Sequence, residues 1–185
     1  QVGELRAFLS RSLMQLGLQR FVLEVAAPLN ELVGQAWIDG GLQIFEEHLY
    51  AEQMQHLLRQ AIASLAQDAQ SPRVLLTTLP GEKHRLGVLM AEACLSVEGA
   101  QCISLGVETP AWDIVQAAKA HRVDIVGLSF SQAMPLKAAH EGLVDLRKRL
   151  DRKCLLWAGG KVWQRTRKDI PGVTLIASLA AIPDA

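Results

Sequence analysis

Hydrophobic positions in the first part of the chain recur with a helical period. One apolar stripe covers residues 5–16, and a second covers residues 21–37. Pro28 lies inside the second stripe and is expected to kink or divide that helix. A third stripe covers about 42–66, with a candidate core of Leu42, Phe45, Leu49, Met54, Leu57, Leu58 and Ile62. We therefore predict a small helical bundle over residues 1–69.

From residue 73 the pattern changes to apolar runs that alternate with helical stretches. The apolar runs predict five strands, at 74–79, 101–106, 123–130, 153–158 and 173–178. The stretches between them predict four helices, near 84–97, 111–121, 134–150 and 162–168. Alternating strands and helices predict a parallel sheet covered on both faces. The expected fold class is α/β: a helical bundle, a polar linker at 67–72, and a Rossmann-like, doubly wound five-stranded domain over residues 73–185.

Composition narrows the possible functions. The 185 residues contain 19 basic and 19 acidic side chains, and this balance argues against a DNA-binding surface on this segment. Cys94, Cys102 and Cys154 form no C-x-x-C pair, which fits reduced thiols in a cytoplasm and offers no zinc site. No apolar run approaches the roughly 18 residues of a membrane span, so no membrane partner is expected. The first residue is not methionine, and we expect a fragment of a longer protein.

Three features with binding chemistry follow predicted strands. His84 lies after the first strand, where a neutral imidazole is a good metal ligand, and Glu82 is a candidate partner for its other ring nitrogen. Ser129 closes the third strand, and Gly159-Gly160 closes the fourth. Parallel strands end at one edge of a sheet, where α/β folds bind ligands, so we expect these residues on the same edge. Taken singly, they also fit a solvated histidine, a capping serine and a plain turn.

Together these residues resemble the cobalamin-binding signature D-x-H-x-x-G … S-x-L … G-G of methionine synthase-like and mutase-like cobalamin domains. Glu82 replaces the aspartate, Ser131 stands where leucine is usual, and the matching positions are His84, Gly87, Ser129, Gly159 and Gly160. The resemblance implies that His84 ligates cobalt in place of the cofactor's own dimethylbenzimidazole. It also implies that the detached nucleotide tail enters a slot beside the serine and the glycines.

The helical part extends the resemblance. Nine residues separate Trp37 from the pair Glu47-His48. In an antiparallel helix pair, Trp37 and Glu47 would differ by only about 5 Å in position along the helix axes. A W-x9-E-H pattern before such a cobalamin module resembles the light-sensing half of CarH-type photoreceptors, which are transcription repressors of the MerR family. Ile38 departs from the pattern, because the best-known photoreceptors have there a histidine that captures cobalt after photolysis. Alone, the pattern also fits a core tryptophan beside two solvated residues.

The resemblance implies a complete mechanism. Adenosylcobalamin would lie between the two domains, with His84 holding cobalt from below, Trp37 capping the upper face, and Glu47 and His48 at the adenosyl group. Light would release that group, shift the bundle and dissociate dark-state dimers or tetramers that bind operator DNA. DNA binding would belong to a helix-turn-helix N-terminal to this segment, in a cytoplasmic regulator that is not an enzyme.

Three other functions remain open at this stage. The chain also fits the corrinoid methyl-carrier module of a methyltransferase, although Trp37, Glu47 and His48 suit a nucleoside-like upper ligand better than a methyl group. A cobalamin-dependent regulator without light sensing, including a redox or cofactor-level sensor, has the same sequence features. A flavodoxin-like domain without cobalamin is the third.

Overall fold

The computed structural model describes residues 2–65, 72–165 and 169–184. The chain divides into two compact units, residues 1–65 and 66–185, and each is described by itself. Most of the linker predicted at 67–72 lies outside the described residues. No helix in the described part of the chain is both long and apolar enough to cross a membrane. The three cysteines carry free thiols, and burial raises the pKa of the Cys94 and Cys102 thiols to about 11.

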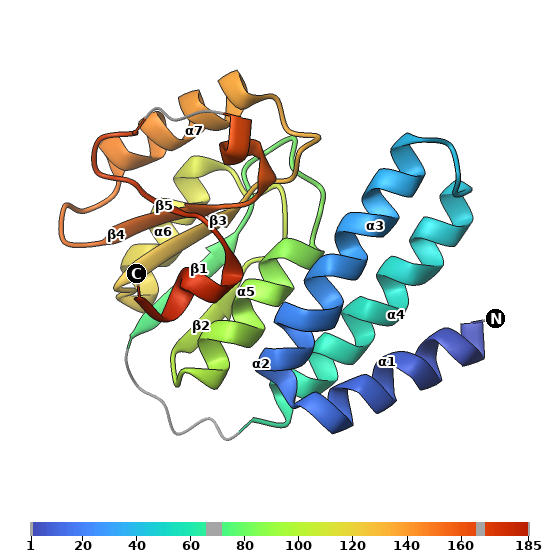
Figure 1. The fold of residues 1–185 in the computed structure, drawn as a ribbon. Coiled ribbons are helices and arrows are strands. Elements are labelled where there is room, and N and C mark those ends of the chain that lie inside the picture. The colour runs from blue at the N-terminus through green and yellow to red at the C-terminus, as the bar shows by residue number, and fades with distance from the viewer. Residues whose placement is uncertain (1, 66–71, 166–168, 185) are drawn as a thin grey trace. The chain divides into compact units, whose positions relative to one another are not determined.

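The first unit is helical (Figure 1). Its elements are α1 (Val2–Leu16), α2 (Leu18–Phe21), the π-helical turn η1 (Val22–Ala26), α3 (Ala27–Ile38) and α4 (Ile44–Ala63). The predicted division at Pro28 takes the form of this π-helical turn. Pro28 follows it in the first turn of α3, and the backbone keeps helical angles at Ala26 and Ala27, so the helix continues through this point. Helix α4, which corresponds to the third predicted helix, begins at Ile44 because Gln43 and Glu46 form a capping box.

The core of the helical unit differs in part from the prediction. Its buried residues are Leu9, Phe21, Val22, Ala26, Tyr50, Met54 and Leu58. Met54 and Leu58 were expected there, but Phe45 and Leu49 are exposed. Helix α3 has no buried residue, although it is rich in apolar side chains. Helical period alone identifies an apolar stripe without showing whether another element covers it.

The second unit contains the five predicted strands in one parallel sheet. They are β1 (Arg73–Thr77), β2 (Gln101–Ser104), β3 (Ile125–Ser129), β4 (Leu155–Gly159) and β5 (Thr174–Ile176), in the order β2-β1-β3-β4-β5. The helical elements are α5 (Leu86–Val97), α6 (Ala111–His121), α7 (Leu136–Arg149), η2 (Lys161–Arg165) and η3 (Leu179–Asp184). The helix predicted at 162–168 is instead a 3-10 turn as far as Arg165, and residues 166–168 lie outside the described part.

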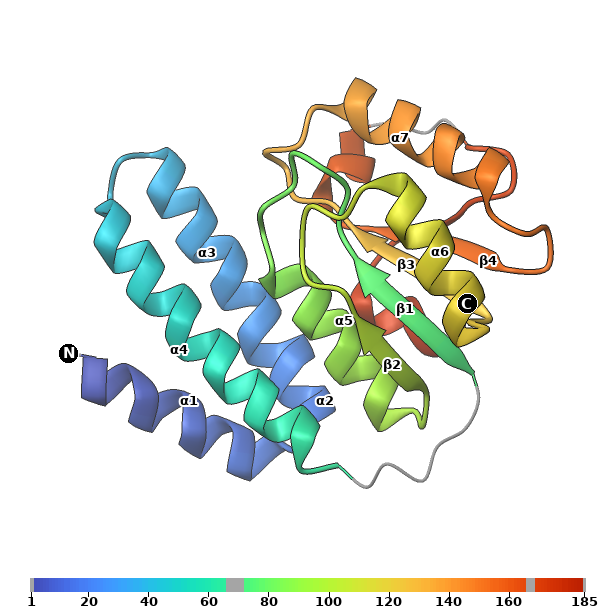
Figure 2. The ribbon, with the colours of Figure 1, turned by 180° about the vertical axis from the view of Figure 1, so that it is seen from behind.

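The sheet is covered on both faces, as its nearly continuous apolar strands predict. Helices α6 and α7 cover one face, and α5 with η3 covers the other (Figures 1 and 2). Between the sheet and α6 and α7 lies a core that includes Leu75, Ile114, Val126, Leu143 and Leu156. This core fixes the strands whose carboxyl ends carry the candidate site residues.

The strand order places a topological switch point between β1 and β3. The chain leaves β1 toward β2 on one side and then returns to pair β3 with β1 on the other. The loops that follow β1 and β3 therefore run in opposite directions, and open α/β sheets bind ligands at the carboxyl edge beside such a point.

Candidate cofactor-binding site

His84 and Glu82 form a hydrogen-bonded pair in the loop after β1. Oε1 of Glu82 lies 2.6 Å from Nδ1 of the imidazole and accepts a hydrogen bond from the backbone N–H of His84 at 3.0 Å. The backbone N–H of Ser131, from the loop after β3, donates to Oε2 of the same carboxylate at 2.7 Å. The Glu82 side chain is 1% exposed, whereas the His84 side chain is 60% exposed. One buried carboxylate thus joins the two loops at the switch point and holds an accessible imidazole.

The charge state of Glu82 follows from these contacts. Burial by itself raises the pKa of this carboxyl group, but the hydrogen bonds from His84 and Ser131 outweigh burial and hold its pKa below the usual value. An ionised Glu82 accepts a hydrogen bond from Nδ1–H of His84. The neutral imidazole with its proton on Nδ1 has a free lone pair on Nε2. A carboxylate behind an imidazole is the usual support of a metal-ligating histidine. The pair therefore fits a site in which the imidazole of His84 would supply one ligand to a metal.

Close packing of glycines joins the other predicted site residues. A side chain at Gly87, in the first turn of α5, would overlap the hydroxyl of Ser129 at the end of β3. Ser129 is paired in register with Gly159 of β4, and Phe130 donates its backbone N–H to the Gly159 carbonyl at 3.0 Å. A side chain at Gly160 would overlap the carbonyl oxygen of Phe130. The structure thus brings Gly87, Ser129, Gly159 and Gly160 together on the edge that carries His84.

A second network ties the His84 loop to the loop after β2. Thr78 is fully buried, and its hydroxyl donates to the carbonyl of Glu82 at 2.6 Å and accepts the backbone N–H of Glu108 at 2.8 Å. The Glu108 carboxylate in turn accepts the backbone N–H of Gly81 at 3.3 Å. Glu108 adopts a φ of 56°, a left-handed conformation that is rare outside glycine. This network fixes the backbone on which Glu82 and His84 are carried.

Replacing Thr78 with valine tests this network. Valine keeps the shape of threonine but leaves the buried carbonyl of Glu82 and the partly buried N–H of Glu108 without the hydroxyl, so we expect a loss of about 2 kcal/mol of stability. Thr78→Ser keeps the hydroxyl and is the matched control. Amide hydrogen exchange should show the Glu108 N–H exchanging faster in Thr78→Val and nearly unchanged in Thr78→Ser. Equal protection of that amide in both variants would show that Thr78 does not join the loops.

The helical unit carries the remaining predicted residues near the connection between α3 and α4. Trp37, at the end of α3, is 51% exposed, so it is not a core tryptophan. Glu47 and His48 lie in the first turns of α4, and Nε2 of His48 is 3.6 Å from Oε2 of Glu47. Ile38, Ile44 and Phe45 are also exposed around this connection. Trp37, Glu47 and His48 therefore all lie close in sequence to the connection between α3 and α4, at one end of the bundle.

Ser131, Thr78 and Glu108 contribute to the site without having been predicted from the sequence. Ser131 acts partly through its backbone N–H, and its hydroxyl lies 3.1 Å from Nδ1 of His84. Thr78 was part of an apolar strand, where threonine is common. The available signal was the position of Thr78 and Ser131, since both follow strands that end at the switch point.

Comparisons with known proteins identify the family of the chain. A family model described as the B12 binding domain matches residues 72–177, and the chain belongs to this family of cobalamin-binding domains. It is 34% identical over 140 residues to the HTH-type transcriptional repressor CarH of Myxococcus xanthus, a match that covers 74% of this chain and 46% of that protein. The chain thus spans about half the length of this curated relative. The site accordingly belongs to a cobalamin-binding domain similar to that of a transcriptional repressor.

Solved structures show the same fold at low sequence identity. The monomethylamine corrinoid protein of Methanosarcina barkeri has a TM-score of 0.66 at 17% identity, with 98% of this chain and 94% of that chain covered. A cobalamin-binding protein from Desulfitobacterium hafniense DCB-2 has a TM-score of 0.50 at 20% identity, with 100% and 96% covered. Both matches include the helical unit as well as the sheet. The architecture predicted from the sequence is therefore confirmed as that of corrinoid proteins.

Proposed function

We propose that this chain is the adenosylcobalamin-dependent, light-sensing region of a transcriptional regulator. The observation that carries the proposal is the buried Glu82 carboxylate behind the accessible imidazole of His84, within a B12-binding domain. His84 supplies the lower ligand of cobalt, and Glu82 holds its ring in position. The nucleotide tail binds beside Gly87, Ser129, Gly159 and Gly160. The glycines have no side chains, so the tail can approach the backbone closely there.

The helical unit recognises the upper ligand in this proposal. When bound, adenosylcobalamin supplies a cobalt–carbon bond that visible light breaks. Trp37 offers a broad apolar surface with an indole N–H, and Glu47 accepts hydrogen bonds from ribose hydroxyl or adenine amino groups. His48, beside Glu47, contributes a further donor or acceptor. The exposure of Trp37 supports this role, because a solvent-facing tryptophan is available to a ligand.

The regulatory part of the proposal rests on similarity to the CarH repressor. Adenosylcobalamin would favour self-association into dimers or tetramers, and light would reverse it. Operator DNA would be bound through a helix-turn-helix domain outside this segment, whose 19 basic and 19 acidic residues leave no net charge to attract a duplex. The protein would act in the cytoplasm as a sensor and not as an enzyme.

Ligand preference tests the upper site against the alternative of a methyl carrier. We expect adenosylcobalamin to bind at least about tenfold more tightly than methylcobalamin, because buried polar contacts discriminate against a ligand without the matching groups. Trp37→Ala and Glu47→Ala should each reduce the preference. Isothermal titration calorimetry measures it, with His56→Ala on the exposed surface of α4 as control. Equal affinities in the wild type would favour the methyl-carrier function.

Illumination tests the sensory function and the part played by Ile38. Green light should change the absorption spectrum of the adenosylcobalamin-loaded protein and shift its elution in size-exclusion chromatography. An isoleucine side chain offers no lone pair to cobalt, so the illuminated protein should exchange readily with cyanide. Ile38→His should slow that exchange, with Ile38→Leu as control. An unchanged elution volume after illumination would contradict the oligomer switch, and slow exchange in the wild type would indicate another imidazole, with His48 the first candidate.

A further inference from the structure

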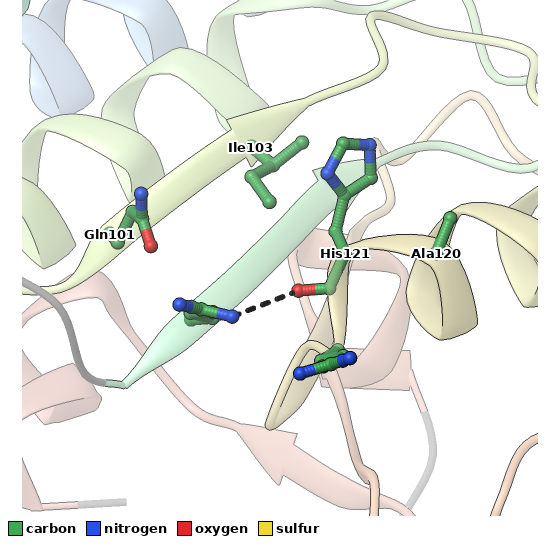
Figure 3. A pocket seen from close by; sticks show the side chains of 6 residues that line it. Gln101, Ile103, Ala120 and His121 are labelled. Carbon is green, nitrogen blue, oxygen red and sulfur yellow. Dashed lines mark hydrogen bonds between the residues drawn. The ribbon is translucent and has the colours of Figure 1, made fainter.

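The α/β unit has a second place with binding chemistry, at the edge of the sheet opposite to His84. A pocket of about 340 Å³ lies where β1 and β2 begin and α6 ends, and its lining residues are Arg73, Gln101, Ile103, Ala120, His121 and Arg122. Figure 3 shows Gln101 and Ile103 on β2 facing Ala120 and His121 on the last turn of α6. This volume lies within the lower range of small-molecule sites.

The pocket forms because the sheet extends beyond the helix that covers it. Leu75 and Ile103 share one face of the sheet and pack into the core near α6. Arg73 and Gln101 lie two residues earlier on the same strands and face, paired with each other in register. Helix α6 has ended at His121 by this level. Polar side chains thus line a space that apolar ones would otherwise fill.

The lining is cationic. It includes two guanidinium groups, an imidazole and a carboxamide, and no aspartate or glutamate is among the lining residues that the structure describes. Nη1 of Arg73 donates to the His121 carbonyl at 3.5 Å, a contact drawn in Figure 3 that holds the guanidinium at the end of α6. Asp124 is the acidic neighbour, and its exposed carboxylate accepts the backbone N–H of Arg73 at 2.8 Å. A guanidinium has five N–H donors, so this arrangement leaves donors for a bound anion.

Arg122 carries the second guanidinium of the pocket. It ends α6 in the left-handed conformation, with φ of 51°, where glycine or asparagine is favoured. Glycine at this position would relieve the strain but would remove a guanidinium from the pocket.

We propose that this pocket binds the phosphate group of a small molecule. Two guanidiniums and an imidazole supply more donors than the two oxygens of a carboxylate accept, and they match the charge and the three terminal oxygens of a phosphate monoester. The concave shape and the zero net charge of the chain favour a small phosphate over a nucleic acid backbone. This site is separate from the cobalamin site and does not depend on it.

Titration of the protein with inorganic phosphate and with adenosine monophosphate, at constant ionic strength, tests the proposal. Calorimetry or phosphorus NMR should show saturable one-to-one binding with a dissociation constant on the order of 1 mM or tighter. Arg122→Asn, which tolerates the backbone conformation, and Arg73→Gln should each weaken binding at least about tenfold, since both remove charge-assisted hydrogen bonds. Arg152→Gln removes an exposed arginine of the same unit outside the pocket and should leave binding within about twofold. Circular dichroism confirms that each variant is folded.

Absence of saturable binding would overturn the proposal, and so would any of three other results. The first is weakening by Arg152→Gln equal to that by the pocket variants, which would mean general charge attraction. The second is competition by acetate as strong as that by phosphate, which would make this a carboxylate site. The third is binding of duplex DNA that is tighter than that of adenosine monophosphate and lost in Arg122→Asn, which would identify the ligand as a nucleic acid backbone.

Discussion

Replacing His84 with alanine is expected to weaken cobalamin binding by at least about a hundredfold. Loss of a residue that only supports a metal ligand typically costs ten- to a hundredfold in affinity, and His84 is the proposed ligand itself. Glu82→Ala should therefore show the smaller, supporting effect. The absorption spectrum of any cofactor bound to His84→Ala should be that of cobalamin with its own base attached. Equilibrium dialysis and spectroscopy provide both measurements.

His56→Ala is the matched control for this prediction. His56 is an exposed histidine of α4 with no proposed role, so its removal should leave affinity and spectrum unchanged. If His84→Ala binds cobalamin as tightly as His56→Ala does, His84 is not the cobalt ligand. Loss of binding in both variants would instead indicate a general effect of histidine removal on folding.

Replacing Gly160 with alanine is expected to cause the largest loss of stability in the α/β unit. Gly160 has a φ of 114°, and a side chain there would overlap the main-chain carbonyl of Phe130, which cannot turn away as a side chain can. Backbone strain and steric overlap together should cost about 3–5 kcal/mol. The urea midpoint, followed by circular dichroism, should fall accordingly, and cobalamin binding should fall with it.

Gly99→Ala separates conformation from overlap in this experiment. Gly99 also has a positive φ, of 88°, but no atom lies within 4 Å of a side chain built there. Its replacement should cost only the conformational part, about 1–2 kcal/mol. Equal urea midpoints for Gly160→Ala and Gly99→Ala would mean that the loop after β4 shifts to accommodate a side chain, and that Gly160 is not needed for close packing.

The sheet could be predicted from the sequence because its three central strands, β1, β3 and β4, are largely buried. A continuous apolar run such as residues 74–79 identifies a buried strand without further information. The apolar run did not show where the strand ends. Strand β1 stops at Thr77, because the hydroxyl of Thr78 already bonds the backbone of the following loop. In the helical unit, the exposure of Phe45 could not be predicted from the sequence. The helical period of apolar residues shows which side of a helix is apolar, but not whether another helix packs against that side.

The candidate site could be predicted where residue type carries the chemistry. An imidazole, a carboxylate and paired glycines after strands are visible in the sequence, and the hydrogen bond between Glu82 and His84 followed from their spacing. The roles of Ser131 and Glu108 were hidden because both contribute backbone N–H groups, which every residue other than proline possesses. Only the fold shows which of these groups point at a buried carboxylate or hydroxyl.

Electron paramagnetic resonance of bound cobalt(II) cobalamin tests ligation by His84 most directly. Protein labelled with nitrogen-15 is loaded with unlabelled cofactor, so the two candidate axial nitrogens differ in nuclear spin. The account predicts that each cobalt line is split into a doublet by nitrogen-15, because the His84 imidazole is the axial ligand, and that His84→Ala loses this doublet. A triplet from nitrogen-14 in the wild type would show that the cofactor keeps its own base and would contradict the account.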